Sequence, residues 1–129
     1  MTDAGSSSDG RTPGLRQAPV LSVDAIEDGW IVRLAGELDL YNAPDVRAAL
    51  ADATSSGPQR VIVDLSQVEF IDSTALGVLI EARTKLSNWK GLHLAGPGLE
   101  TRRALEISGL DRLFAVHQTV DEALAASTT

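Results

Sequence analysis

The sequence contains no cysteine, few aromatic residues and two histidines. Without cysteine the chain has no disulfide, no thiol nucleophile and no thiolate-bound metal. Aromatic residues make up 4% of the chain and hydrophobic residues 43%, so the core is predicted to be aliphatic. His93 and His117 show no metal-ligand spacing, and each is predicted to be a strand residue without a site of its own.

Positive charge is also scarce, because 11 basic residues face 18 acidic ones and the net charge is −7. A nucleic-acid binder shows a basic stripe, and docking on an anionic membrane also requires positive charge, so neither partner is expected. No apolar run approaches the roughly 20 residues that span a bilayer. The N-terminus lacks a charged-then-apolar signal pattern. We expect a soluble, cytoplasmic protein without a cofactor.

Composition divides the chain into three parts. Residues 1–18 are rich in Ser, Gly, Asp, Thr and Pro and are predicted to be a disordered tail. Residues 19–126 are predicted to form one domain, and residues 127–129 a short C-terminal tail. The charges of the first part cancel, so the net charge of −7 belongs to the domain.

Strand-like and helix-like segments alternate along the domain. Asp28-Gly29 separates two apolar runs and predicts an antiparallel hairpin. Residues 36–41 are expected to be a loop, after which Asn42 can cap a helix with Pro44 in its first turn. The order β-β-α-β-α-β-α-β-α predicts an α/β fold, with a mixed, mostly parallel β-sheet and helices packed on it. Strands are expected at residues 20–23, 30–34, 61–65, 91–96 and 113–116, and helices are expected to begin near residues 42, 73, 99 and 119. The second helix is expected to reach about Ser87, and the third is expected to end at Ser108, where Gly109 stops it.

The cluster Asp72-Ser73-Thr74 stands where the connection from the central strand to the next helix should end. Backbone N–H groups at a helix start are unpaired and partially positive, so a hydroxyl there can carry a phosphate. Either Ser73 caps the helix, or Asp72 caps it and leaves the Ser73 hydroxyl free, and spacing does not decide between them. Gly77 costs about 1 kcal/mol relative to Ala. It either leaves an open surface for a partner or packs tightly against a neighbouring loop.

Enzyme chemistry has weaker support. No His or Lys lies near Ser73 in sequence to serve as its base, so a small hydrolase is the third and weakest hypothesis. Phosphate-binding glycine motifs and metal-ligand spacings are absent from the sequence. Two carboxylates near predicted strand ends could act as acid and base, although Asp64 and Glu69 better fit solvated or capping roles. These carboxylates are Glu37, Asp39, Asp64, Glu69 and Asp72.

Three blocks of sequence together carry a family resemblance. The blocks are Gly36-Glu37-Leu38-Asp39 with Ala43-Pro44 and Val46-Arg47; Val63-Asp64-Leu65-Ser66 to Phe70-Ile71-Asp72-Ser73-Thr74-Ala75-Leu76-Gly77; and Leu94-Ala95-Gly96-Pro97 with Arg103 to Gly109-Leu110 and Phe114. They resemble the STAS domain (sulfate transporter and anti-sigma factor antagonist) in its free-standing bacterial form. The central block is highly specific, the flanking blocks fall in the right order, and the resemblance covers roughly residues 19–126.

The resemblance implies an anti-sigma factor antagonist that acts by partner switching in transcription regulation and the stress response. In this family the unphosphorylated antagonist binds an anti-sigma factor, itself a serine kinase, and frees the sigma factor. The kinase phosphorylates the serine after the signature aspartate, here Ser73, and a PP2C-type phosphatase reverses the modification. The chain would then be a phosphoprotein and a binding module, not an enzyme.

By the same match, Asp39 and Asp72 correspond to acidic positions beside the phosphorylated serine. Many members have Gly where this chain has Ala75, a better helix former that should not block the site. The alternative is a regulatory or small-ligand-binding STAS protein that controls no sigma factor. The expected partner-binding residues are Glu37, Asp39, Asp72, Ser73, Thr74, Leu76 and Gly77.

Overall fold

The computed structural model describes residues 18–127, so most of the predicted N-terminal tail lies outside the described residues. Five strands form one sheet in the order β1-β2-β3-β4-β5. β1 runs antiparallel to β2, and the other neighbours are parallel, which confirms the predicted fold class. The elements are β1 (Val20–Ile26), β2 (Gly29–Leu38), α1 (Ala43–Ser55), β3 (Arg60–Ile71), α2 (Ser73–Thr84), the 3-10 turn η1 (Trp89–Gly91), β4 (Leu92–Ala95), α3 (Leu99–Ser108), the 3-10 turn η2 (Leu110–Arg112), β5 (Ala115–His117) and α4 (Val120–Ala125).

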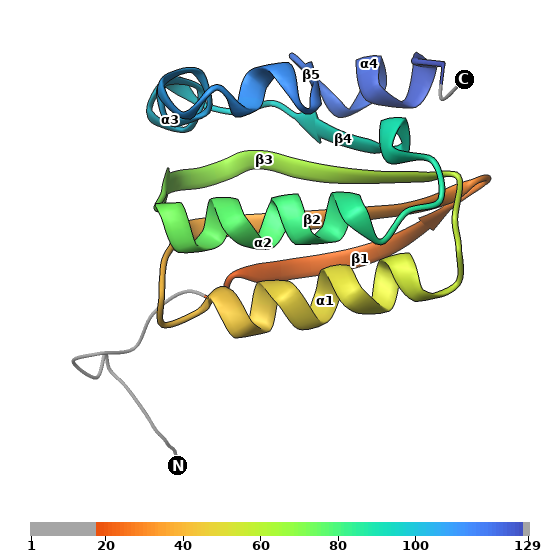
Figure 1. Ribbon diagram of the computed structural model, residues 1–129, viewed down its shortest axis with the longest axis horizontal. Helices are drawn as coiled ribbons and strands as arrows, with labels where there is room; N and C mark the ends of the chain where they lie inside the picture. The colour runs from red at the N-terminus through yellow and green to blue at the C-terminus, as the bar shows by residue number, and fades with distance from the viewer. Residues whose placement is uncertain (1–17, 128–129) are drawn as a thin grey trace, which may run out of the picture.

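Helices α1, α2 and α3 cover one face of the sheet, with α1 and α2 side by side (Figure 1). Right-handed crossovers between parallel strands in sequential order place their helices on the same face. The main core under these helices is aliphatic, as predicted, and extends from Val32 on β2 to Leu105 on α3. On the opposite face α4 covers a smaller cluster through Ala123, which packs with Ile62 and Ala95.

Strands β2 and β3 extend further than predicted. The loop expected at residues 36–41 begins only after Leu38, because β2 continues to that residue. The strand end expected at Leu65 is wrong, because β3 continues to Ile71. Residues 35–38 pair with residues 67–71 as parallel neighbours. One register shift precedes this segment, between Arg33 and Ala35, and a second lies within it, between Gly36 and Glu37. Gly36 adopts a φ of 80°. Such a bulge bends the strand and allows pairing to continue beyond it.

Three other boundaries are displaced. Strand β1 continues to Ile26, beyond its expected end at residue 23. The last strand is Ala115–His117 rather than residues 113–116, because the N–H of Phe114 is bonded to the carbonyl of Leu110 in the preceding turn. Helix α2 ends at Thr84, three residues before the expected end.

Asp64 was expected to be solvated or capping, and its burial corrects the first expectation. Its residue exposure is 6%, and Arg33 Nη1 lies 2.8 Å from its Oδ2. The other carboxylate oxygen accepts the N–H of Ser66 at 3.0 Å. Asp64 is therefore a structural ion-pair residue on the sheet face that α4 covers only in part.

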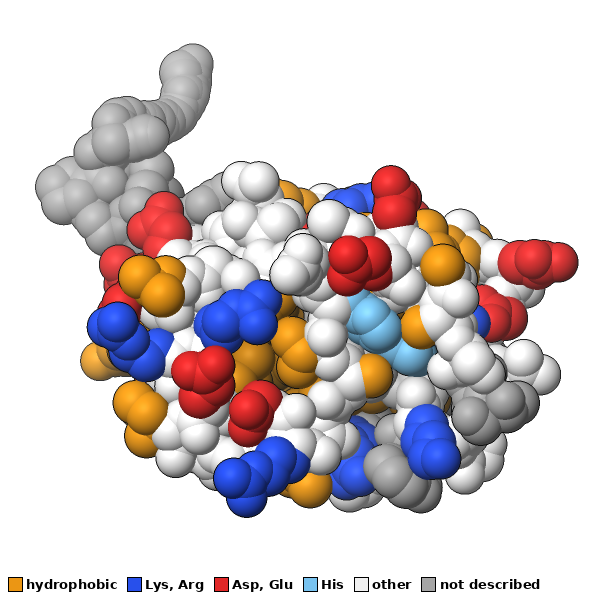
Figure 2. Space-filling model, turned by 90° about the horizontal axis from the view of Figure 1, so that it is seen from above, with side chains coloured by type: hydrophobic (Ala, Val, Ile, Leu, Met, Phe, Trp, Pro, Cys, Tyr) orange, Lys and Arg blue, Asp and Glu red, His pale blue; other side chains and the backbone are white. Residues whose placement is uncertain are grey.

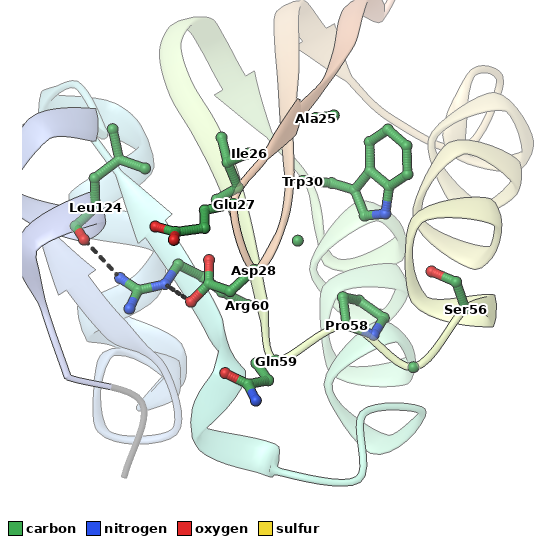
Figure 3. A pocket seen from close by; sticks show the side chains of 12 residues that line it. Ala25, Ile26, Glu27, Asp28, Trp30, Ser56, Pro58, Gln59, Arg60 and Leu124 are labelled. Carbon is green, nitrogen blue, oxygen red and sulfur yellow. Dashed lines mark hydrogen bonds and ion pairs between the residues drawn. The ribbon is translucent and has the colours of Figure 1, made fainter.

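Arg60 anchors α4 at the end of the sheet where β2 and β3 begin. Its Nε donates to Asp28 Oδ2 at 3.1 Å, and its Nη1 donates to the carbonyls of Ala123 and Leu124 (Figure 3). The last carbonyls of a helix have no partner within the helix and carry partial negative charge. Arg60 is 7% exposed, so one buried cation joins β3, the hairpin turn and the C-terminal helix.

Within residues 18–127 the structure contains no helix long and apolar enough to cross a membrane.

We predict that Asp28→Asn lowers the free energy of unfolding by about 1–2 kcal/mol, because it leaves the buried Arg60 cation without its counter-charge. The effect is smaller than for a fully buried pair, since the Asp28 side chain is 31% exposed. Urea unfolding followed by circular dichroism measures the change. Arg103→Gln is the matched control, because Arg103 and its partner Glu100 are each 62% exposed and their ion pair should contribute little. Equal stability of Asp28→Asn and wild type would contradict the anchoring role of Arg60.

Candidate functional site

The ends of β2 and β3 bring two predicted site residues together. Leu38 pairs with Ile71, and the N–H of Asp72 donates to the Leu38 carbonyl at 3.0 Å. Asp39 and Asp72 follow these paired residues directly, so they lie just beyond the ends of two neighbouring strands, which are about 4.8 Å apart. The predicted proximity of the two carboxylates to Ser73 thus has a cause in the strand register.

Asp72, and not Ser73, caps α2. The Asp72 backbone is extended, and its Oδ1 accepts the N–H of Ala75 at 3.0 Å. Ser73 occupies the first helical position and is exposed. Its hydroxyl makes no hydrogen bond with any of residues 18–127. Of the two interpretations that spacing left open, the structure therefore shows the one in which Asp72 is the cap.

Gly77 leaves an open surface one turn beyond Ser73. A Cβ added at Gly77 would meet nothing within 4 Å, so its packing against a neighbouring loop is excluded for the described residues. Thr74 is half-buried. Leu76 was expected at a partner surface, but it is 7% exposed and belongs to the main core. Its side chain can support this end of α2 from below but offers little contact area.

Asn42 organises the connection from β2 to α1 instead of capping α1 with its side chain. Its Oδ1 accepts the N–H of Asp39 at 2.9 Å, and its Nδ2 donates to the carbonyl of Glu37 at 2.7 Å. Asp39 Oδ1 in turn accepts the N–H of Tyr41 at 3.0 Å. These bonds bring Glu37, which is exposed, and Asp39, which is half-buried, to the same end of the sheet as Ser73.

Sequence reasoning missed four exposed apolar side chains at this end. Leu40 is 64% exposed and Tyr41 84%, both in the β2–α1 connection. Phe70 is 49% exposed near the end of β3, and Leu99 is 69% exposed at the start of α3. The β2–α1 connection, the β3–α2 connection and α3 lie together at the left-hand end in Figure 1. Exposed apolar side chains near polar ones are typical of protein-binding surfaces. Leu40 and Tyr41, adjacent in a polar loop, were the one sign in the sequence that such a surface could lie here.

The two histidines lie in β4 and β5, as predicted, but they contact each other. His93 Nδ1 and His117 Nε2 are 2.9 Å apart, and the stacked rings have centroids 5.1 Å apart. The pKa of His93 is lowered to about 4, first by burial, then by His117 and Arg60, against an opposing effect of Asp28. Burial also lowers the pKa of His117. Spacing in the sequence could not reveal this contact, because it depends on the alignment of two separate strands.

Two hollows lie away from Ser73. An open groove of about 860 Å³ surrounds the hairpin turn and includes Trp30 and Arg60 (Figure 3). A pocket of about 290 Å³ lies beside His93 and His117. Among residues 18–127 no group of three or more His, Cys, Asp or Glu side chains could hold a metal ion.

The family model of the STAS domain matches residues 21–123, which is nearly all of the described chain. This chain belongs to the STAS domain family. Among its relatives is the anti-sigma-F factor antagonist RsfB of Mycobacterium tuberculosis, 30% identical over 73% of this chain and 77% of the relative. The anti-sigma-B factor antagonist of Staphylococcus epidermidis is 32% identical over 76% of this chain and 94% of the relative.

Solved structures agree with this assignment of the STAS domain. The crystal structure of an anti-sigma factor antagonist from Mycobacterium paratuberculosis has a TM-score of 0.76 and 32% identity, and it covers 82% of this chain and 90% of its own. A crystal structure of a putative anti-sigma factor antagonist from Thermotoga maritima has a TM-score of 0.74 and 28% identity, covering 81% of this chain and 91% of its own.

We predict that Asp72→Ala lowers the free energy of unfolding by about 1 kcal/mol, because it removes the bond to the Ala75 N–H. Asp72→Ser should lose only a few tenths of a kcal/mol, since serine also caps helices well. Chemical denaturation of the three proteins makes the comparison. If Asp72→Ala were as stable as Asp72→Ser, Asp72 would not be the functional cap.

The histidine pair predicts a loss of stability in acid. Because the pKa of His93 falls to about 4 in the folded chain, the unfolded chain binds more protons between pH 6.5 and pH 4. The contribution of His93 is fully present above pH 6.5 and declines, by up to about 3 kcal/mol, as the pH drops toward 4. Chemical denaturation at several pH values gives the free energy of unfolding of the wild type and of a His93→Gln/His117→Gln variant. The difference between their pH dependences isolates the contribution of the histidine pair. A variant with the same pH dependence as wild type would rule this contribution out.

Proposed function

We propose that this STAS domain protein is an anti-sigma factor antagonist that is controlled at Ser73. In its unphosphorylated form it binds an anti-sigma factor, which is a serine kinase, and so frees a sigma factor. Phosphorylation of Ser73 by that kinase ends binding, and a PP2C-type serine phosphatase restores it. The names of the relatives support antagonist function and a binding module rather than an enzyme. A role in the stress response stays a prediction from the family resemblance.

The observation that carries the proposal is the exposed Ser73 hydroxyl, without a hydrogen bond to the described residues, at the first position of α2. A kinase active site can reach such a hydroxyl without opening the helix, because Asp72 already supplies the cap. The open surface at Gly77 allows a partner's backbone to approach closely. Leu40 and Tyr41, which are 64% and 84% exposed in the β2–α1 connection, add apolar area at this end of the sheet.

The partner contacts that we propose are these apolar residues and the polar residues around Ser73. Exposed apolar side chains supply most of the burial in a protein interface, and polar groups at its rim set orientation and specificity. Glu37, Asp39 and Asp72 make this region acidic, which favours a partner with positive charge opposite it. Thr74 and Gly77 complete the surface along α2.

Phosphorylation would act locally. A phosphate adds about −1.5 to −2 charge beside Asp72 and Asp39. Unpaired N–H groups in the first turn of α2 can compensate part of that charge within the domain. A partner seated on Ser73 and Gly77 would instead have to bury the new charge and volume. We therefore expect blocked binding without a change of fold.

The test incubates the protein and ATP with candidate kinase anti-sigma factors and maps the labelled residue by mass spectrometry. Ser73→Ala should lose the label and keep the partner affinity within about threefold. Ser73→Asp should weaken partner binding by about 30-fold or more, as for an unpaired charge buried in an interface. NMR shifts on phosphorylation should stay within the first turn of α2 and its neighbours.

Thr74→Ala is the matched control, because it removes the adjacent hydroxyl and should leave labelling intact. Full-affinity binding by Ser73→Asp would contradict control of binding by phosphorylation at Ser73. Labelling at another residue would show that the phosphorylation site lies elsewhere. Backbone shifts spread through the sheet on phosphorylation would contradict the local mechanism.

A further inference from the structure

The pocket beside the histidine pair has an unusual lining for this acidic chain. It is formed where β4 and β5 begin, between the turns η1 and η2 and the end of α4. Within the described residues no Asp or Glu lines it, although the whole chain has a net charge of −7. Its charged and imidazole groups are all nitrogen bases: Lys90, His93, Arg112 and His117.

Two of these groups have unused hydrogen-bonding capacity. Arg112 is exposed, and its guanidinium makes no ion pair with any of residues 18–127. His93 is 1% exposed, and its Nε2 is buried without a hydrogen-bond partner among the same residues. An unsatisfied buried nitrogen costs free energy that a ligand or an ordered water can recover. By contrast, Arg60 in the larger groove is already paired with Asp28.

The remainder of the pocket is apolar. Leu92 and Phe114 are buried, and Leu113 is 40% exposed. The volume of about 290 Å³ equals roughly ten water molecules, which suits a ligand with a single ring or a short chain. The imidazoles, pale blue in Figure 2, mark this region on the face seen there.

We propose that this pocket binds a small organic anion, in which an apolar group carries a carboxylate or a phosphate. Arg112 binds the acid group, and Lys90 supplies further positive charge. Because one imidazole N–H is used between the two rings, the histidine pair supplies one N–H donor. The apolar group lies on Leu92 and Phe114. Guanidinium groups suit both acids because their parallel N–H donors match two oxygens. The site lies where β4 and β5 begin, whereas Ser73 follows the end of β3, so this function is separate from the proposed partner surface.

The experiment titrates the full chain with phenyl phosphate, benzoate and uncharged benzamide at constant ionic strength, followed by NMR. At least one anion should shift the amide signals of residues 90–93 and 112–117 and the ring nitrogens of His93, with a dissociation constant of about a millimolar. The stronger of the two anions identifies the preferred acid group. Benzamide should cause no saturable shift.

Arg112→Gln should weaken anion binding by about tenfold or more, as for a lost charge-assisted hydrogen bond. Arg103→Gln removes an exposed arginine on α3 and should bind like wild type. Both side chains are exposed, so both variants should fold. The proposal fails if neither anion saturates, if benzamide binds as well as the anions, if Arg112→Gln keeps wild-type affinity, or if the shifts gather around Ser73.

Discussion

The parallel pairing of β2 with β3 beyond the centre of the sheet is the interaction on which the functional end depends. The bulge at Gly36 lets residues 35–38 stay bonded to residues 67–71, and the pairing delivers Asp39 and Asp72 to the same edge. If β2 ended before Gly36, Asp39 would start from a loop and its position would not be set by β3. The acidic frame around Ser73 thus depends on the strand register, together with the Asn42 hydrogen bonds that hold Asp39 in the loop after β2.

The two ends of the sheet are built differently. Where β2 and β3 begin, the buried Arg60 links the hairpin turn to α4 and leaves its own charge fully engaged. Where they end, Ser73 is exposed and the apolar side chains of Leu40 and Tyr41 extend into solvent. Rigid connection at one end and open surface at the other are what a binding module requires, because a preformed surface loses little entropy when a partner docks.

Local sequence patterns predicted the fold well where residues within or next to an element set its first and last residues. Helix α3 ends at Ser108, as predicted, because Gly109 adopts the left-handed conformation that stops a helix. Prediction failed where pairing with a distant segment sets the limits of an element. Residues 36–38 have the sequence of a loop, but they become part of β2 because they pair with residues 68–71. The same limit hid the contact of His93 with His117. The role proposed for Ser73 comes from the family resemblance, because spacing alone left its function open.

The division of labour between Asp72 and Ser73 suggests how a modification can be reversible without a cost in folding. Capping by Asp72 stabilises α2 whether or not Ser73 carries a phosphate, because the bond to Ala75 uses the aspartate alone. Had Ser73 been the cap, phosphorylation would have replaced the oxygen that accepts that bond and coupled modification to helix stability. With the cap one residue earlier, a charge added at Ser73 meets only solvent, the helix start and whichever surface a partner presents. The free energy of the switch then lies almost entirely in the complex.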